Sequence, residues 1–214
     1  PALVGRAILQ AAFPVAMTTW HVGMTPDRFS SVPTSLLALP FAQPTYDGLT
    51  GATPLSAWKF DHQLAETSDL VLGLTSGSTG ETSAVLIFLG GVYLIARNMM
   101  NWRIPATIFG TVIVFSGLLH LADSSAYPPP LFMLFSGGLM LGAMFMATDM
   151  VGSPMTKLGI VFYGVLIGAL TIVIRIWGGM PEGVMYAILL GNAVVPQIDN
   201  LIQPSVYGTR KGTA

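Results

Sequence analysis

Long apolar runs separated by short polar turns restrict the fold of this chain more than any other feature of its sequence. A membrane-spanning helix needs about 20 predominantly apolar residues. Six runs approach that length: 2–20, 81–97, 104–121, 131–147, 158–177 and 184–202. Only 9% of the 214 residues are charged, whereas about 25% is usual for a soluble domain. The pattern therefore predicts an all-α integral membrane protein with about six transmembrane helices.

These runs divide the chain into four segments. We expect a transmembrane helix over 1–20, an extramembrane insert over 21–80, a five-helix transmembrane bundle over 81–203 and a tail over 204–214. Pro14 would kink the first helix, and a single spanning helix is favoured there over a broken or half-spanning one. Glycines inside the later runs, such as Gly164 and Gly168, are interpreted as sites of close helix packing in lipid.

The insert contains the one long stretch without an apolar run, residues 21–76. Loops of this length in compact proteins are usually functional or disordered. Its aromatic residues, which include Trp58 and Phe60, argue against disorder. A folded insert or a set of short interfacial helices is therefore expected.

Basic residues in short loops indicate which face of the membrane each loop occupies. If the first helix starts in the cytoplasm, one group of basic residues lies on that side and a smaller group lies on the other. The first group is Arg6, Arg97, Arg103, Lys157, Arg210 and Lys211, and the second is Arg28, Lys59 and Arg175. This asymmetry places the insert outside and the tail in the cytoplasm.

Composition also excludes several classes of function. The formal charge of −1 offers no surface for nucleic acid. The chain has no cysteine, so it cannot ligate an iron–sulfur cluster through thiolates. Its three histidines are far apart in the sequence and give no metal-binding spacing. No metal ligand and no catalytic side chain is expected.

Polar residues near the last two runs have simple interpretations. Arg175 and Glu182 flank a short outer turn and can pair there. Asn192 lies in the middle of the last run, and an asparagine in hydrocarbon usually bonds another helix.

The first candidate site is a polar segment of the insert, residues 47–54 (DGLTGATP). Gly48 and Gly51 allow positive φ and close approach by another molecule. Pro54 cannot continue a helix interior, so the hydroxyl of Thr53 is expected on an accessible bend. Such a hydroxyl can be modified covalently, although residue types alone favour a plain surface loop.

The second candidate site is the segment 76–83 (SGSTGETS), which precedes the next apolar run. Ser78 or Thr79 can cap the following helix, with Glu81 or Thr82 in its first turn. A helix N-terminus favours anions such as phosphate, because it offers free N–H groups and a positive dipole end. An ordinary helix cap is the alternative. Glu81 is costly to bury, so it must face water, a partner or a cofactor.

Taken together, these motifs resemble the D subunit family of the Rnf ferredoxin:NAD oxidoreductase complex, a close relative of the B subunit of the sodium-pumping NADH:quinone oxidoreductase. The matching segments are 47–53, 77–83, 101–105, 146–149, 181–183, 192–199 and 204–210. The tail and the spacing favour the Rnf protein, and Met150 and Gly152 depart from the common pattern in a local turn. Family members have about ten spans in two related halves. This chain, which begins with Pro1, therefore resembles the C-terminal half of a two-repeat, urea-transporter-like bundle, and a missing first half is expected.

The resemblance implies a flavin-carrying subunit of a redox-driven ion pump in the bacterial cytoplasmic (inner) membrane. It implies that a flavin transferase joins FMN through its phosphate to Thr53 and reads Asp47 and Thr50. Gly51 and Ala52 would leave room for the transferase and the phosphate. It also implies that the second motif contacts this FMN or a second, non-covalent flavin (FMN or riboflavin). The residues of that contact are Gly77, Ser78, Thr79, Gly80, Glu81 and Thr82.

On the same resemblance, electrons pass between ferredoxin and NAD through the covalent FMN on the extracytoplasmic side, coupled to movement of Na⁺ or H⁺. The expected partners are the other membrane and peripheral subunits, which hold iron–sulfur clusters and further flavins, together with the transferase and the lipid bilayer. Two alternatives stay open: the B subunit of the sodium-pumping enzyme, and a small-solute channel or transporter without a redox role. The segment 47–53 argues against the channel, because a passive pore has no reason to carry it.

Overall fold

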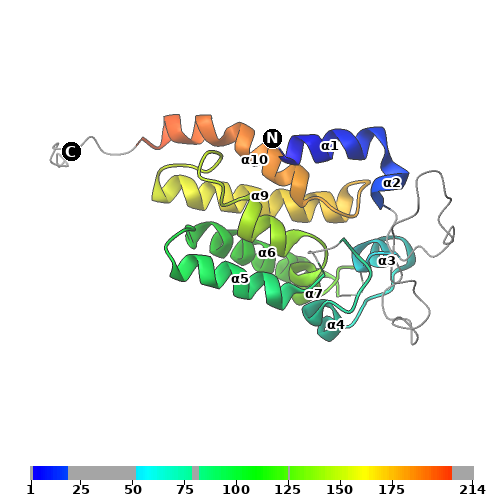
Figure 1. The fold of residues 1–214 in the computed structure, drawn as a ribbon. Coiled ribbons are helices and arrows are strands. Elements are labelled where there is room, and N and C mark those ends of the chain that lie inside the picture. The colour runs from blue at the N-terminus through cyan, green and yellow to red at the C-terminus, as the bar shows by residue number, and fades with distance from the viewer. Residues whose placement is uncertain (1, 19–51, 79–81, 125, 204–214) are drawn as a thin grey trace, which may run out of the picture.

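The computed structural model describes residues 2–18, 52–78, 82–124 and 126–203, and these residues form helices and no strand. Figure 1 shows long helices lying side by side, with short helices gathered at one end. The long helices are α5 (Ala84–Ala96), α6 (Arg103–Ala122), α9 (Lys157–Trp177) and α10 (Val184–Leu201). The short helices α3 (Pro54–Asp61) and α4 (Thr67–Leu72) form the described part of the expected insert. The all-helical prediction is confirmed.

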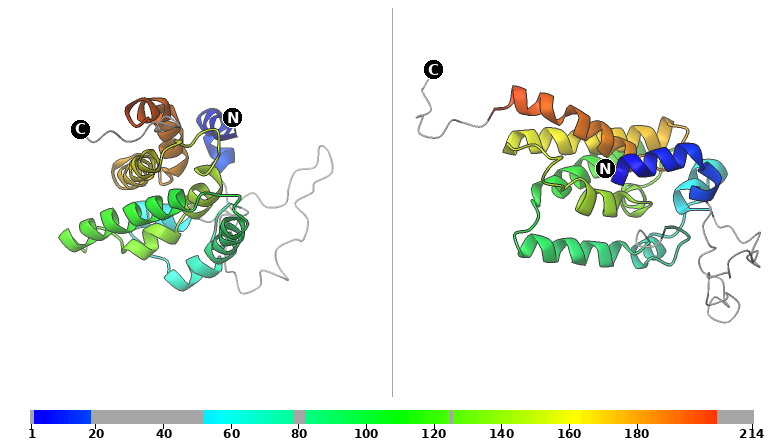
Figure 2. Two further views of the ribbon diagram at one scale, coloured as in Figure 1. Left: turned by 90° about the vertical axis from the view of Figure 1, so that its left-hand side faces the viewer. Right: turned by 45° about the horizontal axis from the view of Figure 1, so that its top comes forward.

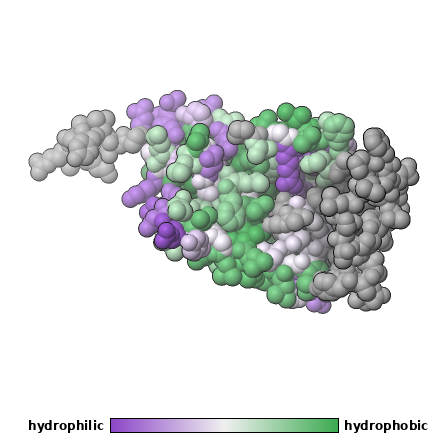
Figure 3. All heavy atoms as spheres, in the orientation of Figure 1, coloured by the Kyte–Doolittle hydropathy of each residue, from purple (hydrophilic) through white to green (hydrophobic). Residues whose placement is uncertain are grey.

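Two helices, α6 and α9, are long and apolar enough to cross a membrane, judged by length and composition. Large apolar side chains on the outside of the bundle, such as Leu86, Leu118 and Phe162, are more than half exposed. Figure 3 shows this apolar surface over the middle of the bundle, with hydrophilic residues at the end where α5 stops. Extensive exposed apolar surface marks a membrane or protein interface. The number of six spans stays a prediction.

The tightest packing joins α6 to α9. A Cβ added to Gly164 would overlap the hydroxyl of Thr107, and one added to Gly168 would lie 2.8 Å from Thr111 Cβ. Small residues four positions apart let two helix backbones approach closely. Both threonine hydroxyls donate to carbonyls of their own helix, at 2.8 Å. The packing interpretation of the two glycines is confirmed.

A polar contact joins α9 to α10. The hydroxyl of Tyr163, which is fully buried, donates to Asn192 Oδ1 at 2.6 Å. This is the bond between helices that the position of Asn192 predicts. It satisfies a polar group that would otherwise be costly in an apolar interior.

The first apolar run is not one helix. It is divided at Phe13 into α1 (Ala2–Ala12) and α2 (Pro14–Thr18). Proline is readily accommodated at the start of a helix but not in its interior, so the break at Pro14 has a local cause. An 11-residue helix is about 16 Å long, roughly half the thickness of the hydrocarbon core. The broken alternative therefore describes this segment, and the single continuous helix was wrong.

The run 131–147 is also interrupted. It forms α7 (Pro130–Phe135), the short α8 (Leu139–Leu141) and a π-helix, η1 (Gly142–Met146). Gly137 adopts a φ of 63°, a left-handed conformation that glycine reaches without strain. The chain therefore breaks at residues 136–138 and leaves the carbonyl end of α7 inside the bundle.

The start of α5 differs from the expectation. The helix begins at Ala84, with Ser83 at the N-cap position and no side-chain cap bond. The cap predicted at Ser78 or Thr79 is therefore wrong. Gly73 (φ 84°) ends α4, and a Cβ there would lie 2.8 Å from the backbone of Ser83. The end of α4 and the start of α5 therefore lie against each other.

Three of the four described basic residues that were expected on the cytoplasmic side lie at one end of the bundle. The end of α5 and the starts of α6 and α9, where Arg97, Arg103 and Lys157 lie, are at the end of the bundle opposite α3 (Figure 1). Arg6 does not join them, because α1 starts beside the middle of the bundle and carries Arg6 to Glu182, 3.4 Å away. Arg28, Arg210, Lys211 and the tail 204–214 lie outside the described residues.

Candidate functional site

Thr53 lies at the N-terminus of α3, where it caps the helix. Its backbone is extended (φ −67°, ψ 152°), and its Oγ1 accepts a hydrogen bond from the N–H of Ser56 at 3.3 Å. Pro54 occupies the first helical turn, a position that suits proline. The side chain of Thr53 is only 9% exposed, so the prediction of an open, accessible bend is wrong. Pro54 starts a helix here, and that helix packs the threonine against the bundle.

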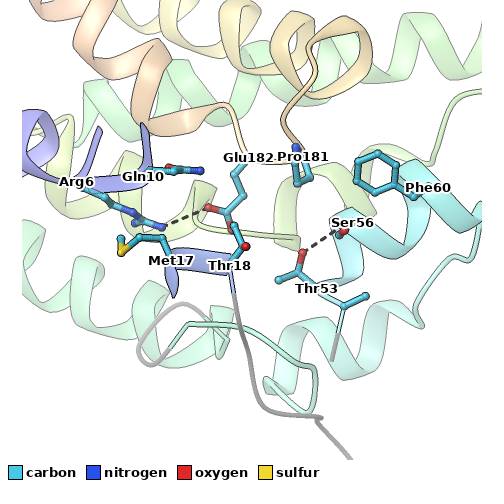
Figure 4. Close-up of a pocket in the computed structure, with 10 residues that line it drawn as sticks. Arg6, Gln10, Met17, Thr18, Thr53, Ser56, Phe60, Pro181 and Glu182 are labelled. Carbon is cyan, nitrogen blue, oxygen red and sulfur yellow. Dashed lines mark hydrogen bonds and ion pairs between the residues drawn. The ribbon is translucent and has the colours of Figure 1, made fainter. Parts of the chain in front are cut away.

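Beside Thr53 is a cavity of about 300 Å³, which lies between α1, α2, α3 and the turn that joins α9 to α10. This volume is at the lower end of the range of roughly 300–1,000 Å³ for small-molecule sites. Figure 4 shows the side chains around it. The lining residues are Arg6, Gln10, Met17, Thr18, Ala52, Thr53, Ser56, Phe60, Pro181 and Glu182.

An ion pair forms one wall of this cavity. Arg6 Nη2 lies 3.4 Å from Glu182 Oε2, and each side chain is a little more than a quarter exposed. The two residues are 176 positions apart in the sequence. Sequence reasoning assigned Arg6 to the other face and missed its role here. The available signal was that Arg6 is the one charged residue in the first apolar run, because an ionisable residue in such a run usually marks a functional site.

A second, smaller cavity of about 20 Å³ also borders Thr53 and Glu182. Its walls include Gly77, Ser78 and Thr82, so the described part of the second motif lies next to Thr53. A Cβ added to Gly77 would lie 3.2 Å from Thr82 Cγ2, so these two residues lie against each other. The structure thus brings the two motifs together, while their contact with a cofactor stays a prediction.

Six of the predicted site residues lie outside the described part of the chain. They are Asp47, Thr50, Gly51, Thr79, Gly80 and Glu81. Of the first motif, the structure therefore describes Ala52, Thr53 and Pro54. Ala52 is exposed and lines the larger cavity.

Lys59 fixes α3 to the end of α9. Its ammonium group donates to the carbonyl oxygens of Arg175 (2.9 Å), Gly178 and Met180 (3.2 Å). Burial lowers the pKa of Lys59 below its usual value. The C-terminal end of a helix is the negative end of its dipole and attracts cations. This contact therefore holds the helix that begins with Thr53 against the bundle.

These features define a class of protein: a helical membrane protein with a ligand-sized cavity at one end of its bundle. The chain belongs to the NQR2, RnfD, RnfE family, whose family model matches residues 1–208. Membership in this family confirms the resemblance that the sequence motifs indicate.

Its similarity to individual relatives extends over nearly the whole chain. It is 42% identical over 221 residues to the D subunit of the proton-translocating ferredoxin:NAD(+) oxidoreductase complex of Clostridium ljungdahlii, covering 99% of this chain and 61% of the relative. It is 40% identical over 222 residues to the D subunit of the ion-translocating oxidoreductase complex of Stutzerimonas stutzeri, covering 97% and 62%. The corresponding protein of Sodalis glossinidius is 40% identical, with 98% and 65% covered. The chain thus spans less than two thirds of the length of these curated relatives.

Proposed function

We propose that this chain is the flavin-carrying part of a membrane subunit of an ion-translocating ferredoxin:NAD oxidoreductase, with FMN joined to Thr53 through a phosphoester. One observation carries the proposal: the threonine that ends a flavinylation-like motif lies in the wall of a ligand-sized cavity. The names of the relatives, which are those of ion-translocating oxidoreductase complexes, support the assignment to such a complex.

The groups around Thr53 suit a bound phosphate. A phosphate on an N-cap hydroxyl would lie at the positive end of the α3 dipole, where free N–H groups favour anions. Arg6 lines the same cavity, where it is paired with Glu182, and its guanidinium has further N–H groups to donate; the hydroxyls of Thr18 and Ser56 supply further donors. A charge-assisted hydrogen bond from a guanidinium to a phosphate is among the stronger ones in proteins.

The remaining walls suit a flat ring system with polar edges. Met17 and Phe60 offer apolar surface, and Gln10 offers an amide that can donate or accept. FMN would supply the one-electron and two-electron chemistry when bound. The residues of this chain would hold its phosphate, position its ring and limit the access of water to it. Gly77, Ser78 and Thr82 would contact this flavin or a second, non-covalent one.

The finer architecture belongs to the same proposal. About six spans would form half of a two-repeat, urea-transporter-like bundle in the bacterial inner membrane, with Thr53 on the extracytoplasmic side. The shared position of Arg97, Arg103 and Lys157 at the opposite end supports this orientation, since basic residues favour the cytoplasmic face. The complex would move Na⁺ or H⁺ and would include iron–sulfur and flavin subunits. The names of the relatives favour this complex over the sodium-pumping NADH:quinone enzyme.

The test is covalent flavin on the full-length protein, expressed with its transferase. Thr53→Asn is the sharpest variant, because asparagine is as good an N-cap residue as threonine or better but has no hydroxyl to esterify. Thr18→Ala is the matched control, because it removes another hydroxyl from the same cavity. On a denaturing gel under ultraviolet light, the wild type and Thr18→Ala should fluoresce and Thr53→Asn should not. A fluorescent Thr53→Asn band, or a wild-type mass without added FMN, would contradict the proposal.

A further inference from the structure

Arg175 is buried in the bundle although it lies near the end of α9. Its side chain is 1% exposed. Nη1 donates to the carbonyl oxygen of Met133 at 2.5 Å, and Nη2 donates to that of Ser136 at 2.9 Å. Both carbonyls belong to the end of α7, where the helix breaks. The guanidinium therefore turns into the bundle, and it stays near the Glu182 carboxylate, since both side chains approach Gly137.

The carbonyl end of α7 has the chemistry of a cation site. The last carbonyls of a helix lack partners within it, and they carry the negative end of the helix dipole. In membrane transporters, such half-helix ends and unwound carbonyls coordinate Na⁺ or H⁺. A Cβ added to Gly137, in the break, would lie 3.3 Å from Arg175 Nη2. The guanidinium thus fills the position that a mobile cation would take.

Cavities at the Thr53 end of the molecule reach this break. The cavity of about 300 Å³ and two small cavities of about 20 Å³ each all border Glu182. One small cavity reaches Gly137 and the other reaches Gly138, which are the two glycines of the break. Arg175 brings a buried positive charge to the break, and this charge opposes the entry of another cation.

Two buried polar atoms mark the break as polar but incompletely paired. Ser136 Oγ and Arg175 Nε have no hydrogen-bond partner within the described part of the chain. Buried groups of this kind are normally satisfied by ordered water. The break is thus a polar place in the bundle that a fixed cation occupies.

We propose that Arg175 is a tethered cation that closes the break between α7 and α8 to mobile cations, so that the ions moved by the complex do not pass through it. The guanidinium satisfies the carbonyls of α7 and repels an approaching Na⁺ or hydronium ion, as fixed arginines do in selective pores. This inference rests on the proposed ion-translocating function. It does not depend on the flavin at Thr53.

Passive ion leak tests the proposal. The full-length protein, in its complex, is reconstituted in lipid vesicles without redox substrates, and uptake of radioactive Na⁺ and of protons is followed. Arg175→Gln removes the charge, and Arg175→Lys keeps it as the matched control. Leak should rise roughly tenfold or more in Arg175→Gln, because the removed charge opposes cation entry, and should stay near the wild-type value in Arg175→Lys. An assembled Arg175→Gln complex that leaks no faster than the wild type would overturn the proposal.

The same samples keep the two proposals separate. Flavin fluorescence at Thr53 reports on the proposed function alone, and the leak reports on Arg175 alone. If the wild-type complex carries no covalent FMN and only the Arg175→Gln complex leaks, the first proposal is refuted and the second is supported.

If Arg175→Gln does not assemble, chemical rescue supplies the test. Arg175→Ala is prepared with millimolar guanidinium, and urea serves as the neutral analogue of the same shape. Guanidinium should restore assembly and the thermal midpoint, since it can donate to the same two carbonyls, whereas urea should not. Equal rescue by both compounds, or rescue by neither, would show that a cation is not what the site requires.

Discussion

The bundle of α6, α9 and α10 and the end of the molecule around Thr53 are held together by different kinds of contact. In the bundle, apolar side chains such as Ile108, Ile167 and Ile188 are fully buried, and glycines bring the backbones together. At the Thr53 end, an ion pair, an ammonium group on three carbonyls and a helix cap act beside a small apolar cluster of Leu55, Leu70 and Phe132. Figure 2 shows this end as a group of short elements beside the long helices.

The difference explains why the larger of the two cavities at Thr53 can exist. Close apolar packing fills space, as in the interior of any folded protein. Polar contacts act at fixed points and leave space between them, and the Arg6–Glu182 ion pair in the cavity wall is such a point. Elements that bind ligands are commonly drawn from the less stable parts of a protein. Substitutions in the bundle should therefore lower global stability, while those at the Thr53 end should act locally.

The largest effect is expected between α6 and α9. Gly164→Ala places a Cβ against the Thr107 hydroxyl, and such overpacking costs about 1–3 kcal/mol. Gly110→Ala on α6 is the matched control, because its Cβ would have no atom within 4 Å. The control should be neutral or stabilising by up to about 1 kcal/mol. Thermal and chemical unfolding of the full-length protein measure both, and equal effects of the two changes would contradict the packing described for the bundle.

At the Thr53 end, Lys59→Met should lower stability by about 2 kcal/mol, the range for hydrogen bonds of a charged group. The loss should be local, because Lys59 joins α3 to carbonyls at and beyond the end of α9. Hydrogen exchange should accelerate in α3 and stay unchanged in α6. Lys157→Met, at an exposed site on the opposite end, is the control. Faster exchange throughout the bundle would mean that the two regions are not independent.

This comparison also explains what the sequence could predict. The bounds of α6, α9 and α10 agree with the apolar runs to within one residue at each end. Apolar periodicity and length carry that information locally. The breaks at Phe13 and at residues 136–138 had visible signals in Pro14 and in Gly137. The apolar character of the two runs nevertheless favoured one continuous helix for each.

Much of the Thr53 site could not be predicted in the same way. The motif located Thr53 through its resemblance to a family, whereas the cavity depends on contacts between distant positions. Arg6 and Glu182 are 176 residues apart, and Lys59 and Arg175 are 116 apart. No local pattern encodes such pairs. The burial of Thr53 was missed for a related reason, since the motif reveals the turn but not the surface against which it packs.

A smaller effect is expected at the polar contact inside the bundle. Tyr163→Phe removes the donor to Asn192 Oδ1 and should cost about 1–1.5 kcal/mol, as for hydrogen bonds between membrane helices. Tyr186→Phe on α10 is the control, because the hydroxyl of Tyr186 makes no hydrogen bond within the described residues. Global unfolding should be affected only by Tyr163→Phe. A loss of stability confined to α10 would show that this contact acts locally, as the contacts at the Thr53 end are expected to do.

The smallest effect on stability should come from the cap at Thr53. In protein made without the transferase, Thr53→Val removes the acceptor for the N–H of Ser56, and the loss of such a cap costs about 1 kcal/mol. That corresponds to roughly fivefold faster amide exchange in the first turn of α3. Thr53→Asn keeps an acceptor and should exchange at the wild-type rate. Equal exchange in the two variants would show that the oxygen of Thr53 does not cap α3. Its burial would then come from packing of Pro54 and Leu55 alone, and the Thr53 end would resemble the bundle more than the present contacts indicate.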